Sequence, residues 1–199
     1  MSKAVMISIR PKWCEKICRG EKTIEVRKTR PNLETPFKCY IYCTQARERL
    51  ITILKDGDEN YGEIYRGKPV FIKTDEGSVC DMLGKRQKVI GEFTCDHIYE
   101  LETRSPGGSY YVKGESQPTT NAVARQSCLT LRDMHEYLKA AKGYGWHISD
   151  LKIYDTPKAL DSFLAERICT RGRDTFGCEG CWDCEKRPPQ SWCYVEEQK

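Results

Sequence analysis

Short stretches in which apolar and polar residues alternate recur along the chain, and this two-residue period predicts β-strands. In the clearest stretch, residues 37–43, the side chains expected to point inward are Phe37, Cys39, Ile41 and Cys43, and those expected to point outward are Lys38, Tyr40 and Tyr42. Further strands are predicted over residues 4–9, 23–28, 69–73, 89–99 and 146–154. The chain is therefore expected to be rich in strands.

Helical patterns lie between these strands. Pro11 suits the first turn of a helix that runs to about Arg19, and Gly20 suits a left-handed residue that ends it. A second helix is expected over residues 131–142, after a capping-box-like pair formed by Thr130 and Asp133. Shorter helices are expected over residues 46–54 and 157–164. Residues 55–67 are interpreted as a loop and residues 103–125 as an irregular insertion.

The alternation of strands with single helices predicts an α+β fold dominated by β-structure, a small mixed barrel flanked by helices. This domain is expected to span residues 1–164. From residue 165 to residue 199 the composition shifts to Cys, Arg, Gly and Pro, which indicates a separate small tail. The content of Tyr, Trp and Phe, 20 residues in 199, argues against disorder.

The stretch from Gly20 to Arg27 holds the most informative group of charges. Thr23, Glu25 and Arg27 share one strand face, and the apolar residues between them share the other. Opposite charges two residues apart can hold each other while offering donors and acceptors to a polar ligand. The same pattern also fits a solvated edge strand with a simple ion pair, and Lys22 also fits a surface lysine at a helix end.

Charge and hydropathy narrow the choice of partner. The net charge is +4, but residues 1–30 hold nine basic and three acidic side chains, a local +6 around this stretch. Such a concentration favours an anionic partner, a phosphate or a nucleic acid. No apolar run approaches the length of a membrane span, and the N-terminus lacks the apolar core of a signal peptide, so we expect a soluble, cytoplasmic protein.

A strand and a helix followed by G-x-K-x-x-E-x-R, here Gly20, Lys22, Glu25 and Arg27, resemble the ASCH domain, a relative of the PUA superfamily of RNA-binding barrels. The chain looks most similar to uncharacterised ASCH proteins of bacteria and phages over residues 1–164. The resemblance implies a PUA-like pseudo-barrel with a cleft that binds RNA or a modified nucleoside. The residues expected to line this site are Arg10, Trp13, Lys22, Glu25, Arg27, Tyr144, Trp146 and His147.

Some small ASCH proteins hydrolyse the amide of N4-acetylcytidine, and the resemblance would then make Lys22 catalytic, with Glu25 beside it. This chain departs from those enzymes, which have a threonine in place of Glu25. They also carry a glutamate before the second helix, where this chain reads Arg125-Gln126-Ser127. A missing acid removes a proton acceptor. A nucleoside amidohydrolase or ribonuclease is therefore an alternative to a binding protein.

Twelve cysteines without a signal peptide favour reduced thiols and a metal site over a disulfide scaffold. Four of them are closely spaced in the tail: Cys178, Cys181, Cys184 and Cys193. Four thiolates can complete a tetrahedral zinc site, and an iron–sulfur cluster is the less favoured alternative because the ferredoxin-type continuation is missing. Cys14, Cys18, Cys39 and Cys43 are interpreted as structural, with a metal site as the alternative. A zinc-containing protein–protein adaptor is the third possible function.

Overall fold

The computed structural model describes residues 2–45, 72–73, 79–80, 87–103, 108–114, 118–139, 142–167, 181–184 and 187–198. For 72–73, 79–80, 165–167 and 181–184 it describes the backbone only. The predicted segments 46–54 and 55–67 lie outside these residues, as does most of 69–73. Among the described residues, no helix is long and apolar enough to cross a membrane.

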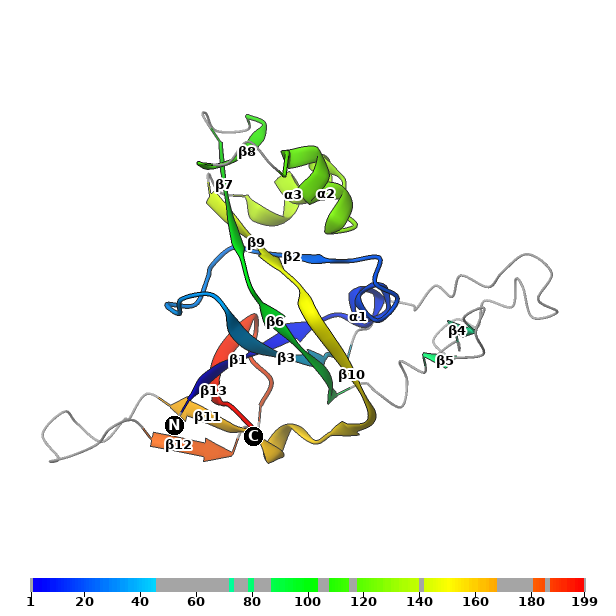
Figure 1. Cartoon of the computed structure of the whole chain (residues 1–199), viewed down its shortest axis with the longest axis vertical. Coiled ribbons are helices and arrows are strands. Elements are labelled where there is room, and N and C mark those ends of the chain that lie inside the picture. Colours follow the sequence, from blue (N-terminus) through cyan, green and yellow to red (C-terminus); the bar gives the residue numbers. More distant parts are fainter. Residues whose placement is uncertain are drawn as a thin grey trace, which may run out of the picture.

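Strands make up most of the described structure (Figure 1). They are β1 (Lys3–Ile9), β2 (Ile24–Arg27), β3 (Phe37–Cys43), β4 (Ile72–Lys73), β5 (Val79–Cys80), β6 (Lys88–Cys95), β7 (Ile98–Thr103), β8 (Tyr110–Val112), β9 (Lys142–His147), β10 (Ser149–Lys158), β11 (Leu164–Arg167), β12 (Cys181–Cys184) and β13 (Trp192–Glu196). The helices are α1 (Pro11–Cys18), α2 (Thr120–Gln126) and α3 (Leu131–Leu138), with a 3-10 turn, η1, at Leu160–Ser162.

Two sheets form the body of the molecule. The larger has the strand order β10-β6-β3-β1-β13-β11-β12, and the smaller has the order β2-β9-β7-β8. The two sheets are joined by two long bent segments, since β6 leads into β7 and β9 leads into β10 with only one or two residues between them (Figure 1). The result is a β-dominated α+β pseudo-barrel flanked by helices, as predicted.

The bends correct two predictions. The apolar patterns at 89–99 and 146–154 each predicted one strand, but each pattern continues from one sheet into the other. At the bends, the His147 amide donates to the His97 carbonyl at 2.9 Å, so the two segments turn together. Apolar residues recur on both sides of each bend, and periodicity does not report a change of partner.

Three further predictions of secondary structure change. Residues 103–125 contain β8 and α2, because Thr119 caps α2 through its side chain, which accepts from the Ala122 amide. The helix expected over 131–142 forms with its capping box but stops at Leu138, since Lys139 takes the left-handed conformation. The helix expected over 157–164 is only the short turn η1, because β10 extends to Lys158.

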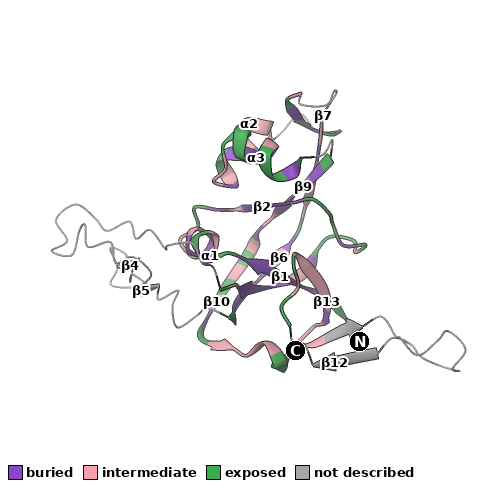
Figure 2. Cartoon of the chain, turned by 180° about the vertical axis from the view of Figure 1, so that it is seen from behind, coloured by how far each residue is buried: buried purple, intermediate pink, exposed green. Residues whose placement is uncertain are grey.

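Both faces of the larger sheet are covered. One face builds a core from β1, β3, β6, α1 and Trp146. The other face buries Tyr40 and Tyr42, which were expected to point outward, against Met6, Phe163 and Val195. The residues that cover this face come from the end of β10, from the residue after η1 and from β13. Figure 2 shows the buried strands β1 and β6 in the middle of the molecule.

Part of the predicted tail lies in the larger sheet. β13 pairs antiparallel with β1, from Lys3 opposite Glu196 to Ile7 opposite Trp192. Val195 of this strand is fully buried. The last strand of the chain therefore lies beside the first, and the residues just before β13 are brought next to Ser8, near the end of β1.

Candidate functional site

The Gly20–Arg27 stretch is placed by the end of α1 and by its pairing with β9. Gly20 adopts φ +71°, as predicted for the residue that ends the helix. The amides of Glu21 and Lys22 then donate to the Lys16 carbonyl at 2.9 and 3.1 Å, which closes the turn. The following residues enter β2 at the edge of the smaller sheet. Ile24 and Val26 pack toward α2 and α3, and Glu25 and Arg27 face the other way.

Lys22 is buried, with only 3% of its surface exposed. Its ammonium donates to the Ser127 carbonyl at 2.7 Å and lies 3.2 Å from Glu25 Oε2. It also lies 5.2 Å from the centroid of the Trp13 ring, within the range of a cation–π contact. A carbonyl, a carboxylate and a π-face all interact favourably with a positive charge.

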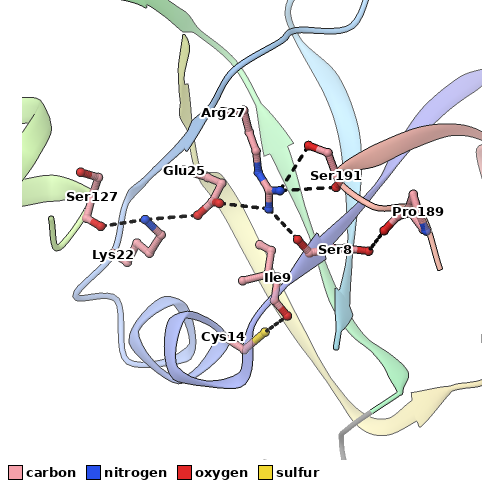
Figure 3. Close-up of polar contacts among 9 residues, drawn as sticks. All are labelled: Ser8, Ile9, Cys14, Lys22, Glu25, Arg27, Ser127, Pro189 and Ser191. Atoms are coloured by element: carbon pink, nitrogen blue, oxygen red, sulfur yellow. Dashed lines mark hydrogen bonds and ion pairs between the residues drawn. The ribbon is translucent and has the colours of Figure 1, made fainter. Parts of the chain in front are cut away.

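Glu25 joins Lys22 to Arg27 (Figure 3). Its Oε1 lies 3.0 Å from Arg27 Nη2, and its Oε2 faces Lys22. The exposed fractions of Glu25 and Arg27 are 6% and 7%. We call Lys22, Glu25 and Arg27 the charged triad. β2 is an edge strand, as one interpretation predicted, but the solvated face and the surface lysine of that interpretation are wrong, because all three side chains are buried.

Arg27 connects the charged triad to the C-terminal segment. Its Nη2 donates to the Ser8 carbonyl at 2.6 Å, and its Nη1 makes longer contacts of 3.5 and 3.4 Å with the carbonyl and hydroxyl of Ser191. The Ser8 hydroxyl donates to the Pro189 carbonyl at 2.6 Å. Arg27 thus holds β1, β2 and the approach to β13 together, a role in the fold that its position in the motif did not predict.

Exposed and half-buried side chains of α1 and α3 lie around the charged triad. Trp13, half-buried, has the ammonium groups of Lys12 and Lys22 at 4.7 and 5.2 Å from its ring centroid. Arg10, the exposed residue that precedes α1, contributes to the electrostatic environment of the Tyr137 hydroxyl on α3. The beginning of α1 therefore lies near enough to α3 for their charges to interact.

Tyr137 is the residue that sequence reasoning missed. Tyr137 is 40% exposed, and Lys28 Nζ lies 5.5 Å from the centroid of its ring. Burial raises the pKa of Tyr137, and the nearby positive charge of Arg27 partly offsets the rise. In the sequence, Tyr137 only marks helical spacing, and the side of α3 that faces Arg27 depends on packing more than 100 residues away from the motif.

The β9 residues predicted for the site divide between two faces. Trp146 is paired with Glu25, and Tyr144 with Arg27, so both share the face of the charged triad. Trp146 is fully buried and packs edge-on against Phe37 at 6.0 Å between ring centroids. His147 is paired with Ile24 on the opposite face, where its Nδ1 lies 2.7 Å from Asp96. His147 is therefore not brought to the charged triad.

Three buried polar atoms on the triad's face of β2 and β9 lack a hydrogen-bond partner among the described residues: Glu25 Oε2, Arg27 Nε and Trp146 Nε1. Glu25 Oε2 is within ion-pair distance of Lys22 but not in hydrogen-bond geometry with it. One of these atoms is an acceptor and two are donors. Buried polar atoms are seldom left unpaired, so this face suits a small polar group that both donates and accepts.

The N-terminal cysteines are in the core, as expected for structural residues. Cys14, Cys39 and Cys43 are fully buried, and burial raises the pKa of the Cys14 and Cys39 thiols well above the ordinary value. Thiols in this state are poor nucleophiles and poor metal ligands. Within the part of the chain that the structure describes, no group of three or more Cys, His, Asp or Glu side chains could hold a metal ion.

The predicted tail ligands are only partly covered by the structure. Cys178 lies outside the described residues. Cys181 and Cys184 are the first and last residues of β12, whose backbone pairs with β11, and their side chains lie outside the described part. Cys193 lies in β13 and is half-buried, on the face of the larger sheet that also buries Tyr40 and Tyr42. The zinc site stays a prediction.

Comparison with known proteins bears on the fold. The chain matches no protein-family model and no curated protein sequence. It is similar to the crystal structure of ASCH from Zymomonas mobilis, at 16% identity and a TM-score of 0.52, over 98% of this chain and 88% of that one. Two single-residue variants of that protein match with a TM-score of 0.51 each, over 98% of this chain and 92% and 89% of theirs. This chain has the ASCH fold.

Proposed function

We propose that this chain is an ASCH protein that binds RNA or a modified nucleoside at the charged triad. The observation that carries the proposal is the triad itself: three buried charged side chains in contact, next to a half-buried tryptophan and a set of exposed cations. Burial of charge costs free energy, and a fold that needed only stability would be served as well by apolar residues. The ASCH fold supports the proposal, because its PUA-like relatives include RNA-binding barrels.

Each member of the charged triad has a different part in the proposal. Lys22 offers its remaining N–H to a base carbonyl or a phosphate, since one N–H already binds Ser127 and another faces Glu25. Glu25 Oε2 accepts from an exocyclic amine of a base. Arg27 contributes chiefly by holding Glu25 in place, because its two terminal nitrogens already contact Ser8 and Ser191.

The surroundings of the triad supply stacking and charge. Trp13 is placed to stack on a base beside Lys22, and Arg10 is placed to face a phosphate. Trp146 is paired with Glu25 across β2 and β9 and offers its buried indole N–H, with Tyr144 as its neighbour on the same face of β9. His147, on the opposite face of β9, has no ligand contact in this proposal.

The geometry favours binding over hydrolysis. A catalytic lysine acts as a neutral amine, which requires that its surroundings disfavour the charge. The carboxylate, carbonyl and indole around Lys22 do the opposite. No carboxylate other than Glu25 forms an ion pair with Lys22 among the described residues. The amidohydrolase and ribonuclease alternatives are therefore outcomes of the test below, as is the protein–protein adaptor.

We also propose that the tail binds one zinc ion through Cys178, Cys181, Cys184 and Cys193. The support is the spacing of the four cysteines and the position of Cys193 in β13, which would fasten the 178–184 segment to the larger sheet. Zinc here would supply folding free energy to a short segment with little core of its own.

Replacement of Lys22 tests the binding proposal. Lys22→Met keeps the length of the side chain and removes its charge. We expect it to weaken binding of a labelled single-stranded RNA of mixed sequence by about tenfold or more, measured by fluorescence anisotropy, because one charge-assisted hydrogen bond is lost. Lys152→Ala, an exposed lysine on β10, serves as the control and should bind as the wild type does. A thermal melt of each variant verifies that it is folded.

Three results would decide against the proposal. Wild-type protein that binds neither this RNA nor N4-acetylcytidine would contradict it. So would equal binding by folded Lys22→Met and Lys152→Ala. Wild-type protein that releases acetate from N4-acetylcytidine, with the activity lost in Lys22→Met, would support the hydrolase instead.

A further inference from the structure

A partly exposed aromatic ring lies at each end of the charged triad. At the Lys22 end, Trp13 has its ring 5.2 Å from the Lys22 ammonium. At the Arg27 end, Tyr137 has its ring centroid 5.5 Å from the ammonium of Lys28, the residue after Arg27, and leaves 40% of its surface open to solvent. Glu25 lies between the two ends, 3.2 Å from Lys22 and 3.0 Å from Arg27. The two rings thus lie beside different residues of the 22–28 stretch, Lys22 and Lys28.

Each ring has a cation from the rim of the site beside it. Lys12 Nζ lies 4.7 Å from the Trp13 centroid, and Lys28 Nζ lies 5.5 Å from the Tyr137 centroid. Lys12 and Lys28 are themselves exposed. An exposed ring with an adjacent ammonium suits a nucleotide better than a nucleoside, because the ring stacks on the base and the ammonium meets the phosphate.

Tyr137 is otherwise hard to explain. In the described part of the chain, Leu131 and Tyr137 are the large apolar or aromatic side chains that are exposed, and both are on α3. Met134 and Leu138 of the same helix are buried and suffice to pack it. Tyr137 instead leaves its ring partly at the surface beside Lys28, on a helix that Met134 and Leu138 hold against β2, so the ring is available to stack on a ligand.

We propose that Tyr137 is a second stacking residue of this site, and that Trp13 and Tyr137 together make it select a single-stranded RNA chain over a free nucleoside. The inference rests on the proposed function and names the ligand class more narrowly. One base stacks on Trp13 beside Lys22, a nearby base stacks on Tyr137, and the phosphates between them lie near Lys12 and Lys28. A free nucleoside can occupy only one of the two positions.

Binding measurements on Tyr137 variants test the inference. The probes are a single-stranded RNA of mixed sequence, the same RNA annealed to its complement, and the four common ribonucleosides. We expect wild-type protein to bind the single strand at least about tenfold more tightly than the duplex or any nucleoside. Tyr137→Leu should weaken single-strand binding about fivefold or more, because it removes the ring, and should leave nucleoside binding within about twofold.

Two matched variants separate stacking from structure. Tyr137→Phe keeps the ring and loses only the hydroxyl, so it should stay within about threefold of the wild type. Tyr111→Leu replaces a half-buried tyrosine on β8 and should bind RNA as the wild type does. Circular dichroism verifies the fold of each variant.

The failure of this inference differs from the failure of the proposed function. If Lys22→Met loses RNA binding but Tyr137→Leu binds as Tyr111→Leu does, only the role of Tyr137 is wrong. A wild-type protein that binds a nucleoside as tightly as the single strand would also overturn the selection for a chain. If Lys22→Met retains RNA binding as well, the proposed function fails and the inference fails with it.

Discussion

Burial decides the energetics of Lys22, Glu25 and Arg27. The carboxylate of Glu25 lies between two cations that have left water, so each cation depends on it for compensation. A buried ion pair contributes little net stability compared with apolar residues, but the loss of one partner costs much, because the other charge stays buried and unpaired.

Glu25→Gln is therefore expected to lower the free energy of unfolding by about 3–5 kcal/mol, since it leaves both Lys22 and Arg27 without an opposite charge. Urea unfolding measures the change. The control is Glu136→Gln, which breaks the exposed Arg132–Glu136 pair on α3 and should change stability by less than about 0.5 kcal/mol. Equal losses in the two variants would show that the triad is solvated in solution.

The sequence predicted which residues of the motif matter but not their burial. Lys22, Glu25 and Arg27 stand out by their spacing, and their alternation correctly put Glu25 and Arg27 on one face. Charged residues are usually exposed, and no residue near the motif in the sequence indicates that these three are buried. Lys22 donates to the carbonyl of Ser127, 105 residues further along the chain, and Arg27 contacts the hydroxyl of Ser191. Contacts of such sequence separation leave no local pattern.

At the scale of elements, the sequence predicted best what local chemistry determines. Pro11 and Gly20 fix the two ends of α1 through backbone conformation, and the capping box of Thr130 and Asp133 fixes the beginning of α3. The strand breaks near Asp96 and at Ile148 were not predicted, because apolar residues recur on both sides of each break. A strand that changes sheets looks in sequence like one long strand.

The role of β12 in the tail depends on the side chains of Cys181 and Cys184, for which the structure describes the backbone only. β12 and β13 carry three of the four predicted zinc ligands. We expect purified protein, kept under reducing conditions, to contain about one zinc per chain by elemental analysis, and Cys181→Ser with Cys184→Ser to lose it. The control is Cys128→Ser, outside the tail. Zinc and iron contents both far below one per chain would contradict a metal site in the tail.

At the scale of the whole molecule, the chain's two ends meet in one sheet. β13 pairs with β1, and the residues that lead into it contact Ser8 and Arg27. The fold class followed from the strand-rich pattern and the motif, but this closure did not, because the shift to Cys, Arg, Gly and Pro suggested a separate segment. Arg27 therefore connects the charged triad to Ser191, in the part of the tail that leads into β13.

The central claim is that RNA binds between α1 and α3 above the charged triad. The most direct measurement is a titration of ¹⁵N-labelled protein with the single-stranded RNA, followed by NMR. We predict that the indole resonance of Trp13 and the backbone amides of residues 22–27 and of α3 shift together, while amides of β10 around Lys152 stay in place. Shifts confined to other surfaces, such as the Lys113–Lys142 group around Glu100 and Glu102, or no shifts at all, would contradict the account.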